Sequence, residues 1–422
     1  MSNKNDSFYY GWVTVAVSFF TLFLAVGTRV SFGVYYIAIL GEFGWSRADT
    51  AGAFSLGMLM HAVFAPITGV FIDRFGPRKL FPFGGIILFF GLLAASRISN
   101  IWQLYLFFGV IIAIGINILS YSPHMSIIPK WFILRRGLAS GLVLSGIGLG
   151  TFLVVPFNQL IIDSFGWRSA FLVFSGIILL VLVPVLVIFH RNSPSDVGQH
   201  PDGIVPQKSI GSDLHEKRDE DFSCINSTWS FKDAISTKTC WLMILAVSGD
   251  SFIINMLIVH QAVYIVDMGY TKLLAAVLVG LVGIIASGGG ILVGFISDRV
   301  GSKKGYLMSS LLTFIGLVFL LFIKEPSTQW MLFAFAIFYG LGSGGKMPMF
   351  ATIIGGFFPG NALGRILSIQ SMGYGIGGAL GSYLGGYFFD LQGTYFVSFI
   401  MLLIVTVVSA SLVQMAFVSR SS

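Results

Sequence analysis

Charged residues are scarce in this chain. Only 10% of its 422 residues are Asp, Glu, Lys or Arg, whereas 55% are hydrophobic. A soluble domain carries about 25% charged residues, so this chain has too little polar surface to face water on every side. The scarcity excludes an ordinary soluble protein and favours a protein of the lipid bilayer.

Cysteines are also few, and nucleotide-binding motifs are missing from the sequence. Cys224 and Cys240 are not spaced as metal ligands, so we expect neither a zinc site nor a disulfide framework. The glycine runs at 288–290 and 373–378 lie inside apolar segments and follow no strand, which favours close helix packing over a nucleotide loop. Without a Walker motif, a nucleophile–base group or a metal cluster, we expect no metal, no cofactor, no enzymatic activity and no ATP-driven pump.

Long apolar runs are what the sequence has instead. A helix needs about 20 mostly apolar residues to cross a bilayer, and the polar stretch 191–238 predicts a flexible cytoplasmic connector. We therefore expect an all-α membrane protein with two pseudo-symmetric six-helix bundles, 1–190 and 239–422, on either side of that connector. The twelve predicted spans are 11–39, 50–72, 80–98, 102–128, 138–163, 168–189, 240–266, 272–297, 305–323, 329–353, 366–388 and 395–417.

The net charge of +7 predicts membrane topology rather than a nucleic-acid partner. The cations do not cluster on amphipathic faces; they lie in short loops between apolar runs, mainly the loops that follow even-numbered spans. Loops rich in Lys and Arg mark the cytoplasmic side of a membrane. We therefore expect a multi-pass protein of the cell membrane with both termini in the cytoplasm.

One loop pattern occurs in both halves of the chain. The segment Gly69–Lys79 is repeated in form by Gly294–Lys304, and each copy ends an apolar run. Its aspartates lie at helix C-termini, where the macrodipole disfavours an anion, so each needs a partner that can bias one conformation over another. The alternative is that the cations only hold the loops inside. The predicted gating residues are Gly69, Asp73, Arg74, Arg78, Arg135, Arg136, Asp298 and Arg299.

The repeated pattern, G-x-x-x-D-R-x-G-x-[RK]-[RK], resembles the loop motif of the major facilitator superfamily. The segment Trp131–Gly146, WFILRRGLASGLVLSG, resembles the monocarboxylate transporter pattern aromatic-Phe-x-Lys-Arg-Arg-x-Leu-Ala-x-Gly-x-Ala-x-Ala-Gly. Leu134 replaces the Lys of that pattern, and Val143 and Ser145 replace Ala. The resemblance implies two six-helix bundles around a central cavity, and transport of lactate, pyruvate or related carboxylates, commonly with a proton. Bacterial proteins of this neighbourhood also include oxalate/formate exchangers.

The eighth predicted span departs from the family. Four residues before Gly294 the family places an Arg, and four residues earlier an Asp. Gly290 and Ala286 stand at these positions. Transport of an anion therefore requires other cations, and proton coupling requires another acid.

Ionisable residues inside the spans are candidates for those roles, because each costs a few kcal/mol to bury in a membrane. Arg29 matches the family's first-helix Lys by its distance from Gly11, and its guanidinium offers paired donors to a carboxylate. Lys346 lies among small residues and can replace the missing eighth-span Arg. Asp250 and His260 are the proton-coupling candidates. The alternatives are that Arg29 snorkels or pairs with Asp250, and that Lys346 has a structural pairing role.

Polar residues at helical spacing supply further candidates. Asn117, Tyr121 and His124 follow at i, i+4 and i+7, which places all three on one face of the fourth helix. Gln261 shares a face of the seventh span with Asp250. His61 has no polar companion that we identify at helical spacing, which favours a packing role.

These patterns predict a secondary active transporter of small organic anions. Arg29 and Lys346 would bind a carboxylate, with hydrogen bonds from Asn117, Tyr121, His124 and Gln261, and a proton or counter-anion would move as well. The alternatives are an oxalate/formate-type exchanger, a facilitator for drugs or neutral solutes, and a non-transporting membrane sensor.

Overall fold

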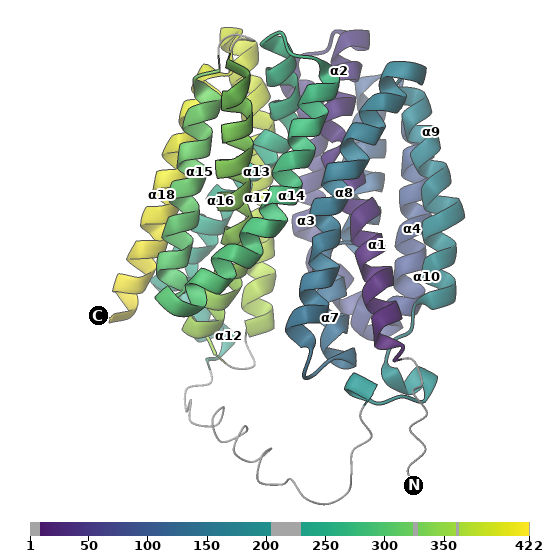
Figure 1. Cartoon of the computed structure of the whole chain (residues 1–422), viewed down its shortest axis with the longest axis vertical. Coiled ribbons are helices and arrows are strands. Elements are labelled where there is room, and N and C mark those ends of the chain that lie inside the picture. Colours follow the sequence, from purple (N-terminus) through teal and green to yellow (C-terminus); the bar gives the residue numbers. More distant parts are fainter. Residues whose placement is uncertain (1–8, 204–228, 324–327, 360–362, 422) are drawn as a thin grey trace, which may run out of the picture.

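The protein is a bundle of long helices (Figure 1). The computed structural model describes residues 9–203, 229–323, 328–359 and 363–421. Most of the predicted connector, residues 204–228, lies outside this part. The described flanks of the connector form the short helices η3 (Pro194–Val197), η4 (Pro201–Gly203) and α12 (Phe231–Ser236).

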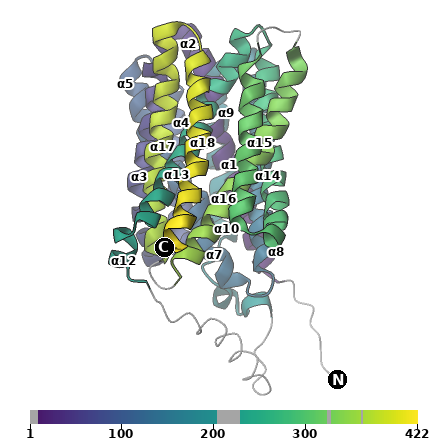
Figure 2. The ribbon, with the colours of Figure 1, turned by 90° about the vertical axis from the view of Figure 1, so that its left-hand side faces the viewer.

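Two groups of helices stand side by side (Figure 1). The first group contains α1 (Gly11–Val30), α2 (Phe32–Phe43), α3 (Arg47–Phe75), α4 (Pro77–Ala95), α5 (Ile101–Leu104), η1 (Tyr105–Ile112), α6 (Ala113–Ile118), α7 (Tyr121–Trp131), α8 (Arg136–Phe165), α9 (Trp167–Ile177), η2 (Ile178–Leu182) and α10 (Val183–Phe189). The second contains α13 (Lys238–Asp267), α14 (Lys272–Val300), α15 (Ser302–Leu321), α16 (Gln329–Phe357), α17 (Leu363–Gln392) and α18 (Phe396–Ser421). Figure 2 shows the same helices running nearly parallel to one long axis.

Ten helical segments of the described chain are long and apolar enough to cross a membrane. The helices α16 and α17 are 29 and 30 residues long and do not belong to those ten. Many large apolar side chains on the outside are exposed, including Phe83, Leu180 and Ile291. An all-helical bundle with such a surface is suited to lipid, and the predicted all-α membrane fold with twelve spans is confirmed.

The fourth span is not the single helix that the sequence predicted. Residues 105–112 form the π-helix η1, and the backbone leaves the helix at Leu119 and Ser120 before α7 begins. Pro123 has no N–H to donate to the carbonyl four residues earlier, so the helix can restart there but cannot run through without losing that bond. Asn117 and His124 therefore lie on different helices, and the prediction of one continuous polar face is wrong.

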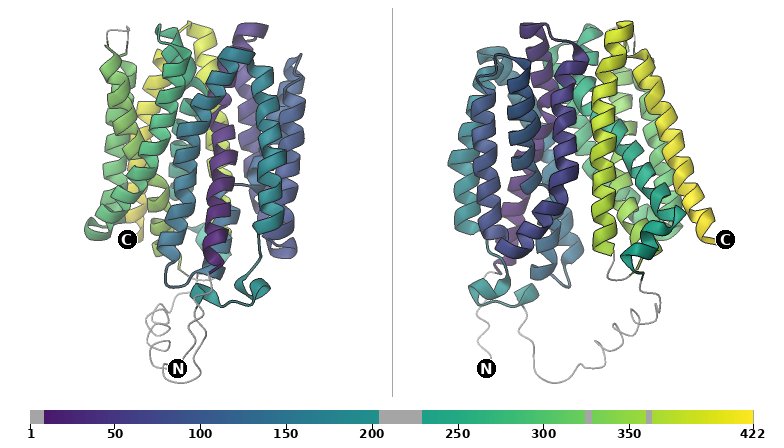
Figure 3. Two further views of the ribbon diagram at one scale, coloured as in Figure 1. Left: turned by 45° about the vertical axis from the view of Figure 1, so that its right-hand side comes forward. Right: turned by 180° about the vertical axis from the view of Figure 1, so that it is seen from behind.

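The two bundles touch mainly at one end. We call the end where α1 begins and α18 finishes the near end, and the opposite end the far end. On α17, Gly386 packs against the backbone of Arg47 and Ala48 at the far end of α3, and Gly375 packs against Met58 and Ala62 at the middle of α3. Toward the near end the ribbons of the two bundles diverge (Figure 3).

A polar network closes the far end. The Arg47 guanidinium donates Nη1 to Asp267 Oδ2 at 2.6 Å and Nη2 to Asp267 Oδ1 at 3.1 Å, which joins α3 to α13. Asp390 of α17 accepts from the backbone N–H groups of Arg47 and Ala48 at 3.0 and 2.7 Å. An aspartate at the first turn of α3 is favoured by the helix macrodipole, so this contact binds the bundles together by charge as well as by hydrogen bonds.

Candidate functional site

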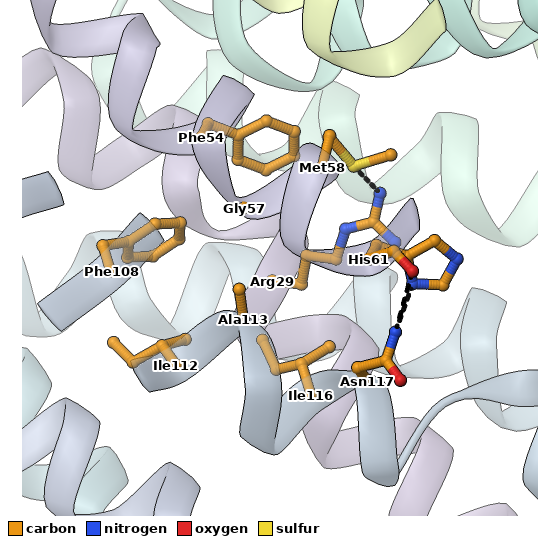
Figure 4. Close-up of a pocket in the computed structure, with 10 residues that line it drawn as sticks. All are labelled: Arg29, Phe54, Gly57, Met58, His61, Phe108, Ile112, Ala113, Ile116 and Asn117. Atoms are coloured by element: carbon orange, nitrogen blue, oxygen red, sulfur yellow. Dashed lines mark hydrogen bonds between the residues drawn. The ribbon is translucent and has the colours of Figure 1, made fainter. Parts of the chain in front are cut away.

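A narrow cavity surrounds Arg29 in the first bundle. Its volume is about 30 Å³, room for about two water molecules. Figure 4 shows Arg29 and His61 on one side, with Phe108, Ile112 and Ile116 on the other. The lining residues come from α1, α3, η1 and α6: Arg29, Phe54, Gly57, Met58, His61, Phe108, Ile112, Ala113, Ile116 and Asn117.

Arg29 is partly buried, and its hydrogen-bond partners are neutral. Its Nη2 donates to Asn255 Oδ1 at 2.8 Å and lies 3.0 Å from Met58 Sδ. Asn255 belongs to α13, so this hydrogen bond joins the two bundles beside the cavity. Arg29 takes part in none of the three ion pairs of the described chain. The alternative of a structural Arg29–Asp250 pair is therefore wrong, and the guanidinium keeps an uncompensated positive charge.

His61 has a polar environment that sequence reasoning missed. Thr68 donates its hydroxyl to Asn117 Oδ1 at 2.8 Å, and Asn117 Nδ2 lies 2.9 Å from His61 Nδ1. Because an amide N–H₂ can only donate, Nδ1 accepts, and the neutral imidazole carries its proton on Nε2. Thr68 is seven residues after His61 on α3, two helical turns away, and this spacing was the signal that could have found the pair.

Lys346 and Asp250 form a buried ion pair in the second bundle. Lys346 Nζ lies 2.5 Å from Asp250 Oδ1, and their side chains are 4% and 5% exposed. The other carboxylate oxygen accepts from the Tyr306 hydroxyl at 2.8 Å. The predicted charge on Lys346 is therefore compensated by Asp250, and Lys346 does not line the cavity around Arg29.

The remaining predicted ligands are not brought into this cavity. His124 is fully buried against Phe81, with ring centroids 4.4 Å apart, and neither of its nitrogens has a hydrogen-bond partner. Tyr121 is 36% exposed at the start of α7. Gln261 is buried on α13, and its Nε2 also has no partner.

His260 belongs to the far-end network. Its Nδ1 lies 3.0 Å from the Tyr395 hydroxyl and its Nε2 lies 2.8 Å from the Ser382 carbonyl. Since a carbonyl only accepts, Nε2 carries the proton and Tyr395 donates to Nδ1. Arg47 Nη1 donates to the same hydroxyl at 2.9 Å, so His260 is linked through Tyr395 to the contact between the bundles.

The predicted gating residues lie at the near end. Among the described residues, no atom lies within 4 Å of a side chain added at Gly69 or Gly294, so no helix of this part of the chain packs closely against these two glycines. Asp73 and Asp298 are exposed, and no ion pair of the described residues involves either. The cations of this set are exposed as well: Arg74, Arg78, Arg135, Arg136 and Arg299.

An ionisable side chain such as Arg29 inside a bundle of membrane-spanning helices marks a candidate site for a substrate or ion. The sequence matches the family model of the Major Facilitator Superfamily over residues 17–323 and 289–421. The chain therefore belongs to the major facilitator superfamily, and it is monocarboxylate transporter-like. This relationship indicates a transporter and not an enzyme.

Individual relatives support the assignment. The chain is 27% identical to monocarboxylate transporter 13 of Rattus norvegicus over 93% of this chain and 85% of the relative. It is 26% identical to monocarboxylate transporter 11 of Homo sapiens over 93% and 80%. Among solved structures, a D-xylose–proton symporter shares the fold, with a TM-score of 0.71, 15% identity and coverage of 96% of this chain and 97% of that one.

Proposed function

We propose that the protein is a secondary active transporter of small monocarboxylates that works by alternating access and is coupled to protons. The observation that carries this proposal is the uncompensated charge of Arg29. An arginine at the centre of a membrane costs about 2.5 to 3.5 kcal/mol on insertion scales, and its two partners, Met58 and Asn255, are neutral. A bound carboxylate would supply the missing negative charge and accept paired N–H groups.

The size of the cavity supports a small substrate. Sites for drug-sized ligands enclose roughly 300 to 1,000 Å³, about ten times the volume around Arg29 or more. A facilitator for drugs is therefore less well supported than a carrier of an acid with a few carbon atoms.

The pair of Asp250 and Lys346 is our proposed proton site. While Asp250 is ionised, it holds the ammonium of Lys346 at 2.5 Å. Protonation of Asp250 would remove the negative charge and free Lys346 to attract the substrate anion from the second bundle. One proton and one monoanion would then cross together without net charge, which avoids the penalty of about 2.3 kcal/mol for moving one charge against 100 mV. Exchange for a counter-anion is the alternative means of avoiding it.

The distribution of cations supports an orientation. Arg74, Arg135 and Arg299 lie at the near end, where α1 begins and α18 finishes. By the positive-inside rule this end, and with it both termini, would face the cytoplasm. The Arg47–Asp267 network would then close the outer side of the cell membrane, and His260 would act in this gate. On opening to the outside, the near-end residues Asp73 and Asp298 would gain partners between the bundles.

Uptake into proteoliposomes tests the proposal. We expect labelled pyruvate or lactate to accumulate when the interior is alkaline, and Arg29→Ala to abolish this uptake because the only uncompensated cation of the cavity is lost. Arg97→Ala, which removes an exposed cation outside the spans, is the matched control and should keep wild-type uptake. Unchanged uptake in Arg29→Ala would refute the role of Arg29, and uptake of oxalate and formate alone would favour the exchanger.

A further inference from the structure

The first residues of the connector lie against the near end of the first bundle (Figure 1, teal, beside the N mark). We call residues 192–202 the clasp. Asp202 Oδ2 accepts from the backbone N–H groups of Ile133 and Leu134 at 2.8 and 2.9 Å. These two hydrogen bonds tie the connector to the loop between α7 and α8, just after α7 ends.

The clasp also holds the residues that precede α1. The Asp202 N–H donates to the Tyr9 hydroxyl at 3.1 Å, and that hydroxyl donates to the Trp131 carbonyl at the end of α7. Gln199 Oε1 accepts from the Tyr10 N–H at 2.9 Å. The clasp therefore joins the end of α7 to the start of α1.

The backbone of Asp202 has an uncommon conformation. Its φ of 56° lies in the left-handed region, and Asp202 is the only residue other than glycine with a positive φ in the described parts of the chain. Such a conformation persists where the surrounding contacts hold it. The contacts of the Asp202 carboxylate and N–H are the ones that do so here.

The other end of α7 has the properties of a hinge. Leu119 and Ser120 are not helical, and the Ser120 side chain does not cap α7, so backbone angles can change here without interrupting a helix. On α7 itself His124 is fully buried, and neither ring nitrogen is hydrogen-bonded. Because unpaired buried polar groups destabilise a structure, the present position of α7 requires contacts that offset this cost, and the clasp supplies some of them.

We infer that the clasp holds α7 against α1 and thereby favours the conformation in which the near end is open. In this structure the clasp is formed and the bundles diverge toward the near end (Figure 3). When the near end closes, α7 turns at Leu119 and Ser120 toward the second bundle, and Asp202 releases the loop after α7. A contact made in only one of two conformations shifts the equilibrium toward that conformation. This inference rests on the proposed alternating access and adds control of it by the connector.

Hydrogen exchange of the purified full-length protein tests the contact itself. Asp202→Gly is the sharpest variant, because glycine adopts a positive φ without strain and only the carboxylate is lost. We expect the amides of Ile133 and Leu134 to exchange at least tenfold faster in this variant, since each loses a hydrogen bond to a charged acceptor. Asp202→Asn keeps an acceptor oxygen without the charge and should show an intermediate rate.

Thiol labelling tests the effect on the conformation. With Cys224 and Cys240 replaced by Ser, a cysteine introduced at Ala51, which is buried near the far end, reports opening of that end to a membrane-impermeant reagent. Asp202→Gly should raise the labelling rate about tenfold, because loss of the clasp favours closure of the near end. His200→Ala, which changes an exposed residue of the clasp, is the matched control and should leave both exchange and labelling unchanged.

Two results would overturn the inference. Wild-type exchange at Ile133 and Leu134 in Asp202→Gly would refute the contact, and faster exchange with unchanged labelling would refute its effect on the near end. If Asp202→Gly has a general fold defect, exchange rises throughout the bundle; wild-type exchange at the two amides in Asp202→Asn would then refute the clasp. Neither measurement uses a substrate, so a failure to transport pyruvate would count against the proposed function and not against the clasp.

Discussion

Replacement of Asp250 by Asn tests the proposed proton site. The substitution keeps the shape of the side chain, but it removes the negative charge 2.5 Å from Lys346 Nζ and leaves one acceptor oxygen for two donors, Lys346 Nζ and the Tyr306 hydroxyl. One pH unit corresponds to about 1.4 kcal/mol per proton, so symport of one proton per anion supports about tenfold accumulation across that gradient. The variant has no carboxyl group to titrate at this position and should not accumulate substrate.

The assay compares accumulation with counterflow in the same proteoliposomes. Across a gradient of one pH unit, the wild-type protein should concentrate labelled pyruvate up to about tenfold, whereas Asp250→Asn should stop at equal concentrations. Exchange of labelled for unlabelled pyruvate should persist in the variant, because Arg29 is unchanged. Accumulation by Asp250→Asn that matches the wild type would refute the assignment.

The same pair makes a prediction about stability. Removal of one partner of a buried ion pair costs about 3 to 5 kcal/mol, whereas replacement of both by neutral residues is often close to neutral. We therefore expect Asp250→Asn to lower the thermal unfolding temperature and Asp250→Asn/Lys346→Met to restore most of the loss. Glu42→Gln is the matched control, because its pair with Arg168 has exposed side chains (43% and 40%) and such pairs contribute less than about 1 kcal/mol. A double variant no more stable than the single one would contradict the argument.

Two further predictions concern the contacts between helices. Arg47→Ala should open the far end, because it removes the paired hydrogen bonds to Asp267. A cysteine introduced at the buried Ala51 should then react faster with a membrane-impermeant thiol reagent. Arg168→Ala, whose ion pair lies within the first bundle, should leave that reaction rate unchanged, and equal rates in the two variants would disprove the gate. Gly377→Ala should lower the free energy of unfolding by about 1 to 3 kcal/mol, because its methyl group would meet the Ser248 backbone carbonyl of α13. Gly288→Ala, whose methyl group would meet open space, is the control in thermal unfolding. An equal effect of the two substitutions would contradict the close packing of α17 against α13.

Much of the helical architecture could be predicted from the sequence because length and hydrophobicity alone determine what can cross a bilayer. The span predicted at 305–323 is α15 (Ser302–Leu321), and that at 80–98 is α4 (Pro77–Ala95). The errors at the ends have local causes: Gly76 and Gly301 adopt positive φ, which starts the next helix sooner than the apolar run suggests.

The contacts between side chains were harder to predict. Arg29 was found because a charge in an apolar span is conspicuous, but its partner Asn255 was missed, since an amide carries no charge and its relevant contact is on the other bundle. The choice between Arg29 and Lys346 as the partner of Asp250 depends on how α13 and α16 pack, and helical spacing within one span contains no information about that. The break at Leu119 and Ser120 moved His124 away from Asn117 for the same reason: a periodic pattern assumes a continuous helix.

The central claim, that Arg29 binds the carboxylate of a transported anion, is tested most directly by an equilibrium titration of the purified protein with pyruvate. We expect saturable binding by the wild-type protein, weakened at least thirtyfold in Arg29→Ala because charge-assisted hydrogen bonds from a guanidinium contribute about 2 to 5 kcal/mol, while Arg97→Ala binds normally. Wild-type affinity in Arg29→Ala would contradict the account.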